Sequence, residues 1–213
     1  MKVKIWVPTH DQRVPAHFAL QQLPLDIQAF AKAGMNMGFS FASSCDLNGM
    51  RNSALEEALA EDYDFLIMQD ADVVVEGGGL LRLVQSCEEH DATACVAAVA
   101  TRQIERNRLR MNVLPFKPDE VYEVERAGTG CIAMDLRRLR KMAEEYDGPW
   151  FWREYEDKRC TTQKVGQDIF FTYLVASLGG KTVCDSRIET NHPHLNHDHL
   201  AYIPTIVKSV VES

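Results

Sequence analysis

The feature that most constrains the fold is a short apolar run that ends in two acidic residues. Residues 65–68 read Phe-Leu-Ile-Met, and Asp70 and Asp72 follow almost directly. Four apolar residues bounded by polar ones predict a strand buried on both faces, as in parallel sheets. Ligands gather at the carboxyl ends of such strands, and two carboxylates one residue apart could reach one divalent cation there. The alternative is that Asp70 and Asp72 are only the polar end of a strand that leads into a turn.

The rest of the chain alternates between predicted strands and predicted helices. Apolar stretches predict further strands at 2–7, 37–43, 94–100, 131–134 and 181–188. Helical spacing of apolar residues predicts helices at 15–23, from there to about residue 34 after a break at Pro24, and at 52–61, 80–90, 135–146 and 166–178. Residues 44–49 and the basic segment 101–112 read as loops. This order predicts a single α/β domain over residues 1–213, with a Rossmann-like, mostly parallel central sheet flanked by helices.

Composition narrows the classes of partner. Lys and Arg number 23 against 31 Asp and Glu, a formal net charge of −8, so neither nucleic acid nor an anionic membrane would be attracted. No apolar run has membrane-spanning length, and the apolar part of the N-terminus is too short for a signal peptide. Six scattered cysteines with no C-x-x-C pair are typical of reduced thiols. We therefore expect a cytoplasmic protein without a membrane span.

Polar residues and glycines near the other predicted strand ends and helix starts are further candidates for a site. Arg51, just before a helix, could pair with a phosphate or form a surface salt bridge. Asp46 lies in a loop where Asp is also common for turn formation. Gly128 and Gly130 would let backbone approach a ligand closely, although a tight turn needs the same residues.

Two more candidates follow near the C-terminal end. Asp168 opens a predicted helix, where the helix dipole favours a carboxylate and where it could also be a structural N-cap. Residues 191–199 hold four of the chain's seven histidines, and they fit either a metal ligand or a solvated His-rich run.

The order of these motifs resembles the GT-A nucleotide-sugar glycosyltransferases, most closely the small family-2-like enzymes of bacteria and phages. The resemblance runs from Val7-Pro8-Thr9 to about His194. It is carried by Arg51-Asn52, Asp70-Ala71-Asp72, Gly128-Thr129-Gly130, Gly166-x-Asp168-x-x-Phe171, and Asp185 seven positions before His192.

The resemblance implies a metal site. Asp72 would bind Mn²⁺ or Mg²⁺ directly, and Asp70 would reach the ribose or a metal-bound water. His192 would supply a nitrogen to the same ion, with His194 as the alternative. Such an ion neutralises the leaving diphosphate as a Lewis acid.

The resemblance also implies roles for the remaining candidates. Asp168 corresponds to the general base of inverting relatives, but Gln167 stands where many relatives carry another acid, so inversion or retention stays open. The donor would further contact residues of several loops: Pro8 and Thr9 at the nucleoside, Asp46 at the base, Arg51 at the phosphates, and Gly128 and Gly130 at the sugar.

The sequence therefore predicts a metal-dependent hexosyltransferase that moves a sugar from a nucleotide-diphosphate sugar to an acceptor hydroxyl. Residues from 1 to about 100 would bind the donor, and those from about 101 to 200 would hold the acceptor and the catalytic group. A nucleotidyltransferase is an alternative, although residues 8–14 lack the glycine-rich loop that would cradle a triphosphate. A catalytically inactive nucleotide-binding module is another. A zinc hydrolase that uses the histidine cluster is a further alternative, but the sequence contains no H-E-x-x-H motif.

Overall fold

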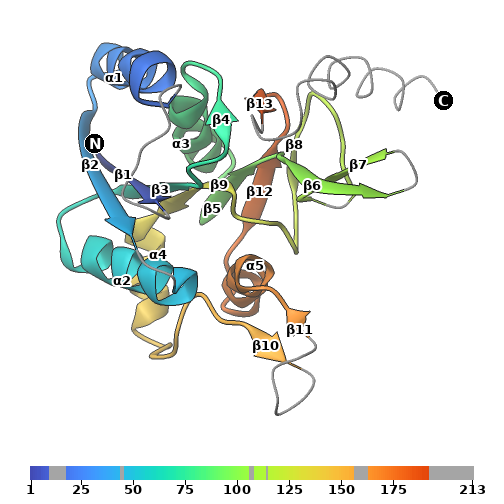
Figure 1. Ribbon diagram of the computed structural model, residues 1–213. Coiled ribbons are helices and arrows are strands. Elements are labelled where there is room, and N and C mark those ends of the chain that lie inside the picture. Colours follow the sequence, from blue (N-terminus) through green and yellow to red (C-terminus); the bar gives the residue numbers. More distant parts are fainter. Residues whose placement is uncertain (10–17, 44–45, 106–107, 114, 156–162, 192–213) are drawn as a thin grey trace.

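A seven-stranded sheet forms the centre of the protein in a computed structural model, which describes residues 1–9, 18–43, 46–105, 108–113, 115–155 and 163–191 (Figure 1). Across the sheet the strands are β2 (Asn36–Ser43), β1 (Lys2–Thr9), β3 (Phe65–Gln69), β9 (Cys131–Asp135), β5 (Ala94–Ala97), β12 (Thr182–Asp185) and β8 (Val121–Glu123).

Most strands of this sheet run in one direction. Strand β1 pairs in parallel with β2 and β3, and β5 pairs in parallel with β12. Strand β9 lies antiparallel between β3 and β5, and β8 is antiparallel to β12 at the edge. Because β9 reverses direction on both of its sides, β3 and β5 point the same way. The prediction of a mostly parallel α/β sheet flanked by helices is confirmed.

Helices cover both faces of the sheet. On one face α1 (Leu23–Lys32) and α3 (Gly79–Glu89) enclose one apolar core; on the other, α2 (Leu47–Ala60), α4 (Leu136–Ala143) and α5 (Gln167–Ser177) enclose a second (Figure 1). The pleat of β3 divides its apolar side chains between them. Phe65 and Ile67 enter the α1/α3 core, while Leu66 and Met68 enter the other. All four are fully buried, as the apolar run predicts.

The helices around Pro24 and at the start of α2 differ from their predictions. Pro24 does not break a helix: residues Phe18–Gln22 form a π-helical segment, η1, and α1 begins directly after it with Pro24 in its first turn. Proline is tolerated there because first-turn N–H groups have no intrahelical acceptor. Helix α2 begins at Leu47, so part of the predicted loop 44–49 is already its first turn.

The basic segment 101–112 is mostly paired strand, and its prediction as a loop is wrong. Strands β6 (Ala100–Glu105) and β7 (Arg108–Met111) form an antiparallel pair beside the main sheet (Figure 1). Backbone pairing stabilises such a ribbon whatever its charge, so the arginines misled the prediction. The remaining short pairs are β4 (Val74–Val75) with β13 (Thr190–Asn191), and β10 (Glu154–Tyr155) with β11 (Gln163–Val165).

Two expectations from composition concern the described residues. Four cysteines fall within them, and all four are unpaired and buried, as expected: Cys87, Cys95, Cys131 and Cys184. None of the helices in the described ranges is both long and apolar enough to span a membrane.

Arg140 of α4 fixes the C-terminal end of α2. Its Nε donates to the Leu59 carbonyl at 3.0 Å. Its Nη2 donates to the carbonyls of Ala58, Glu61 and Tyr63 at 3.3, 2.6 and 2.9 Å. The last carbonyls of a helix have no intrahelical donor, so a cation here satisfies them and complements the helix dipole. Arg51 lies toward the N-terminal end of the same helix, so the Arg140 hydrogen bonds help to position Arg51.

Replacing Arg140 by methionine should lower the free energy of unfolding by about 1–3 kcal/mol, because several carbonyls lose a charged donor. Urea unfolding followed by circular dichroism measures the change. Lys141→Met is the matched control, since it removes the same charge from an exposed position of α4. Equal effects of the two substitutions would show that charge alone matters.

Candidate functional site

The sheet topology brings the predicted site residues to one edge. Asp70 follows the carboxyl end of β3. Because β9 is antiparallel to β3, its first residue pairs with the last of β3, Gln69 with Cys131, and the preceding glycines fall beside Asp70. Helix α2 precedes β3 in the chain, and α5 precedes β12. Each helix runs back across the sheet to the start of its strand, so the N-terminal ends of both helices lie at this edge as well. Arg51 and Asp168 lie near those ends.

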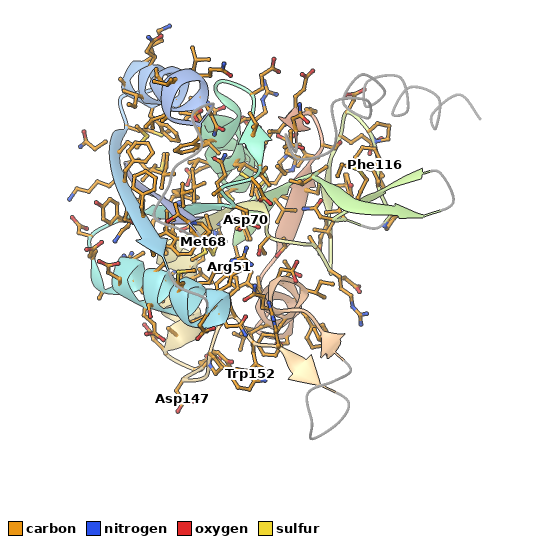
Figure 2. All side chains as sticks on the ribbon, viewed as in Figure 1. Arg51, Met68, Asp70, Phe116, Asp147 and Trp152 are labelled. Atoms are coloured by element: carbon orange, nitrogen blue, oxygen red, sulfur yellow. The ribbon has the colours of Figure 1, made fainter. Side chains whose placement is uncertain are left out.

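Arg51 links three elements of the site from a buried position. Its Nη2 lies 2.6 Å from Asp70 Oδ1, and its Nη1 donates to Thr129 Oγ1 at 2.9 Å. Its guanidinium carbon also lies 5.8 Å from the centroid of the Phe151 ring. Only 3% of the Arg51 side chain is exposed, whereas 31% of the Asp70 side chain is, so the ion pair is buried on the arginine side and reaches solvent on the carboxylate side (Figure 2).

Three carboxylates, those of Asp70, Asp72 and Asp168, lie near one another at this edge. Burial raises the pKa of Asp70 above its ordinary value, Arg51 opposes that rise, and the charges of Asp72 and Asp168 add to it. A carboxylate in this position is stabilised by any further positive charge. The electrostatics of the edge therefore favour a cation beside Asp70.

The glycines before β9 face the acidic residues. The amide of Asp70 donates to the Gly130 carbonyl at 2.8 Å. A Cβ atom at Gly128 would lie 3.0 Å from Asn112 Cβ and 3.2 Å from Asp168 Oδ2. The edge thus has room for backbone but not for a side chain at Gly128.

Asn112, which the sequence did not point to, holds the first of these glycines in place. Its Oδ1 accepts from the Val99 amide at 2.7 Å, and its Nδ2 donates to the Gly128 carbonyl at 2.9 Å. Its backbone carbonyl accepts from the Gly128 amide at 2.8 Å. Gly128 is therefore fixed from both its N–H and its C=O by one residue.

Asp168 is not the cap of its helix. The N-cap of α5 is Gly166, and Asp168 is the second residue of the helix. Its Oδ1 accepts from the Ile169 amide at 3.0 Å, and its Oδ2 faces Gly128. The preceding Gln167 is buried, and no described group hydrogen-bonds its Oε1.

Asn52, next to Arg51 on α2, holds a second wall of the site. Its Nδ2 donates to the Phe151 carbonyl at 2.8 Å, and its Oδ1 accepts from the Phe151 amide at 2.9 Å. The Phe151 ring stacks on Phe171 of α5 at a centroid distance of 4.9 Å. The next residue, Trp152, is 53% exposed (Figure 2).

The other predicted donor contacts lie toward the β2 side of this edge. Thr9 is buried and its hydroxyl donates to the Ala42 carbonyl at 3.2 Å, so it joins β1 to β2 beside Pro8. Asp46 occupies the N-cap position of α2 and lines a hollow of about 330 Å³ together with Trp6 and Met50.

The predicted metal ligands are placed only in part. Asp70 and Asp72 belong to one turn, closed by the Val73 amide on the Asp70 carbonyl at 3.0 Å. His192 and His194 lie outside the described residues. Within the described ranges, no group of three or more His, Cys, Asp or Glu side chains could hold a metal ion. Two carboxylates do fit a divalent ion that takes its other oxygens from phosphates and water.

Comparison with known proteins gives a likeness of fold. No family model and no curated protein sequence matches this chain. Among solved structures, 381 chains match. The protein A197 from STIV superposes with a TM-score of 0.59 at 20% identity, over 90% of this chain and 85% of that one.

Two further matches are nucleotide-sugar enzymes. A variant of Drosophila β1,4-galactosyltransferase 7 with manganese, UDP-Gal and xylobiose gives a TM-score of 0.50 at 14% identity, over 93% of this chain and 73% of that one. UDP-glucose pyrophosphorylase from Acinetobacter baumannii gives 0.52 at 10% identity, over 100% and 94%. This chain therefore has the GT-A-like fold that the sequence predicted.

The two glycines before β9 should respond differently to a methyl group. Gly128→Ala should lower the free energy of unfolding by about 1–3 kcal/mol, because the new Cβ is too close to Asn112 and Asp168. Gly130→Ala is the matched control, since its Cβ would meet nothing nearer than Val73 at 3.6 Å. Chemical unfolding of both variants measures the difference, and equal losses would contradict the close approach.

Proposed function

We propose that this protein is a metal-dependent glycosyltransferase that moves a sugar from a nucleotide-diphosphate sugar to an acceptor hydroxyl. The observation that carries the proposal is the meeting of the Asp70–Asp72 turn, Arg51 and Asp168 at the carboxyl edge of the sheet. The GT-A-like fold supports it, and one matching enzyme of that fold was solved with manganese and UDP-Gal. The sugar moved would be a hexose.

In this proposal Asp72 and Asp70 would hold a Mn²⁺ or Mg²⁺ ion together with the donor diphosphate, and His192 would be the third protein ligand. Such an ion supplies positive charge to the departing diphosphate. Burial, together with the charges of Asp72 and Asp168, raises the pKa of Asp70. A cation bound beside Asp70 would lower that pKa again and stabilise the charged carboxylate, which supports this role. Arg51 keeps Asp70 Oδ1 engaged and adds its own positive charge toward the phosphates.

Asp168 would act as the general base. Its Oδ1 is engaged by the Ile169 amide, while its Oδ2 faces the glycines before β9. An acceptor hydroxyl on Oδ2 would lose its proton there as its oxygen bonds to the anomeric carbon of the donor sugar and the nucleotide diphosphate leaves. Gly128 and Gly130 would border that sugar.

The donor base would lie on the β2 side. Pro8 and Thr9 end β1 there, and the hollow lined by Asp46 offers both a carboxylate and apolar walls to a base. Residues from 1 to about 100 would thus bind the donor, and those from about 101 to 200 would contribute the acceptor side and Asp168.

The likeness to UDP-glucose pyrophosphorylase favours a nucleotidyltransferase as the second candidate. Such an enzyme binds a triphosphate, which calls for a glycine-rich loop after the first strand. Residues 8–14 of this chain contain no glycine and a single arginine, so glycosyl transfer is the better supported of the two.

Asp72→Asn should abolish Mn²⁺-dependent binding of the donor, because one of two carboxylate ligands is lost. A thermal-shift panel of nucleotide sugars, each with and without Mn²⁺, measures this, since a bound ligand raises the midpoint of unfolding by mass action. The wild type should be stabilised by one nucleotide class only when Mn²⁺ is present. Asp147→Asn is the control, because Asp147 is exposed and far from the site (Figure 2). Metal-dependent binding that survives Asp72→Asn would count against the assignment.

Asp168→Asn should leave donor affinity within about twofold and reduce turnover by about 10²–10⁴-fold, because an amide still accepts from Ile169 but cannot take a proton. Calorimetry with Mn²⁺ and the nucleotide diphosphate measures the affinity, and release of nucleotide from the donor measures turnover. A fully active variant would reduce Asp168 to a structural residue of α5.

A further inference from the structure

A buried polar network lies directly behind the Asp70–Asp72 turn. Gln22, the last residue of η1, and Gln69, the last residue of β3, pair through their side-chain amides. Gln22 Nε2 donates to Gln69 Oε1 at 2.8 Å, and Gln69 Nε2 donates to Gln22 Oε1 at 3.0 Å. The two residues are 3% and 0% exposed, and they are 47 positions apart in the chain.

The same two side chains hold the backbone that follows the acidic turn. Gln69 Nε2 also donates to the Val73 carbonyl at 2.6 Å. Gln22 Oε1 also accepts from the Val75 amide at 3.1 Å. The backbone of the turn is therefore fixed immediately before Asp70, one residue after Asp72 and again in β4.

Asp26 of α1 extends the network to the start of α3. Its Oδ2 accepts from Gln22 Nε2 at 3.2 Å, and its Oδ1 accepts from the Gly78 amide at 3.3 Å. Gly78 is the N-cap of α3 and has a φ of +87°, a conformation that glycine adopts without strain. Asp26 is 1% exposed, and burial raises its pKa to about 6. The segment from Gln69 to Gly78 is thus held at both ends.

These groups have little freedom to adopt another arrangement. A buried amide or carboxylate that loses its partner is left unsatisfied, and this penalty exceeds the net gain from an ordinary hydrogen bond. π-Helical turns such as η1 are rare in proteins, and those that occur are often found at functional sites. The network therefore selects one conformation of the turn between Gln69 and Val73, and with it the directions of the two carboxylates.

We propose that Gln22, Gln69 and Asp26 are positioning residues that fix the Asp70–Asp72 turn for the donor diphosphate and its cation. That role in donor binding rests on the proposed function. The conformational role, holding the turn, does not, because it concerns the free protein. None of the three side chains is proposed to touch substrate.

Gln22→Met tests the proposal, because methionine keeps the length of the side chain and removes every hydrogen bond that it makes. Gln21→Met is the matched control, since Gln21 is the exposed neighbour in the same π-helical turn. Hydrogen exchange of the full chain without ligand should be faster over residues 70–78 in Gln22→Met than in Gln21→Met. Calorimetry with Mn²⁺ and uridine diphosphate, or guanosine diphosphate if the wild type prefers it, should show affinity weakened by about tenfold or more.

Asp26→Asn is a second, milder variant in case Gln22→Met fails to fold. An amide can still accept from Gly78, but its NH₂ would face the Gln22 donor, so only one link is broken. We expect faster exchange near Gly78 and a smaller loss of affinity. In both variants kcat for bound donor should change less than the affinity, and circular dichroism should show the same folded fraction as in Gln21→Met.

Each outcome decides one of the two claims. Unchanged exchange over residues 70–78 in both variants would overturn the network's role in holding the turn. Faster exchange with unchanged diphosphate affinity would overturn its role in donor binding. Faster exchange in a protein whose wild type binds no nucleotide diphosphate with Mn²⁺ would support the network and overturn the proposed function.

Discussion

The site depends on one antiparallel strand inside an otherwise parallel region. Had β9 run parallel to β3, its N-terminal glycines would lie at the opposite edge of the sheet, a full strand length from the aspartates. Because it runs antiparallel, the chain enters β9 beside the point where it leaves β3, and the Asp70 amide bonds directly to Gly130. The crossover helices α2 and α5 then add Arg51 and Asp168 to the same edge. The reversal of β9 thus brings the glycines to the aspartates, and the two helices bring Arg51 and Asp168 to them.

Several carboxylates gather at this edge close to Arg51. Asp70, Asp72 and Asp168 lie near one another, while Arg51 is the cation paired with Asp70. Burying the Arg51 guanidinium has a desolvation cost, and its partner Asp70 stays 31% exposed. In the proposed function these carboxylates serve a cation and an anionic ligand rather than the folding of the chain.

The sequence predicted those parts of the site that local patterns encode. An apolar run before Asp70 fixes the strand and its end, and motif order placed Arg51 and Asp168 near it. Long-range partners left no such signal. Gln69 reads as one more residue of a strand end, and only the fold shows that it meets Gln22. Asn112 stands in a basic segment that looked like a loop, where neighbouring arginines hid a paired strand. His192 stays a prediction, because it lies outside the described residues.

Adjacent residues of α2 hold two different segments of the site. Arg51 grips the carboxylate side through Asp70, and Asn52 clamps the Phe151 backbone, beside which Trp152 is exposed. A rigid helix cannot shift one of these residues without the other. Any displacement of α2 along its axis is therefore transmitted together to the Asp70 side chain and to the Phe151 backbone. One turn of α2 thus couples the position of Asp70 to that of Phe151, two residues that are far apart in the chain.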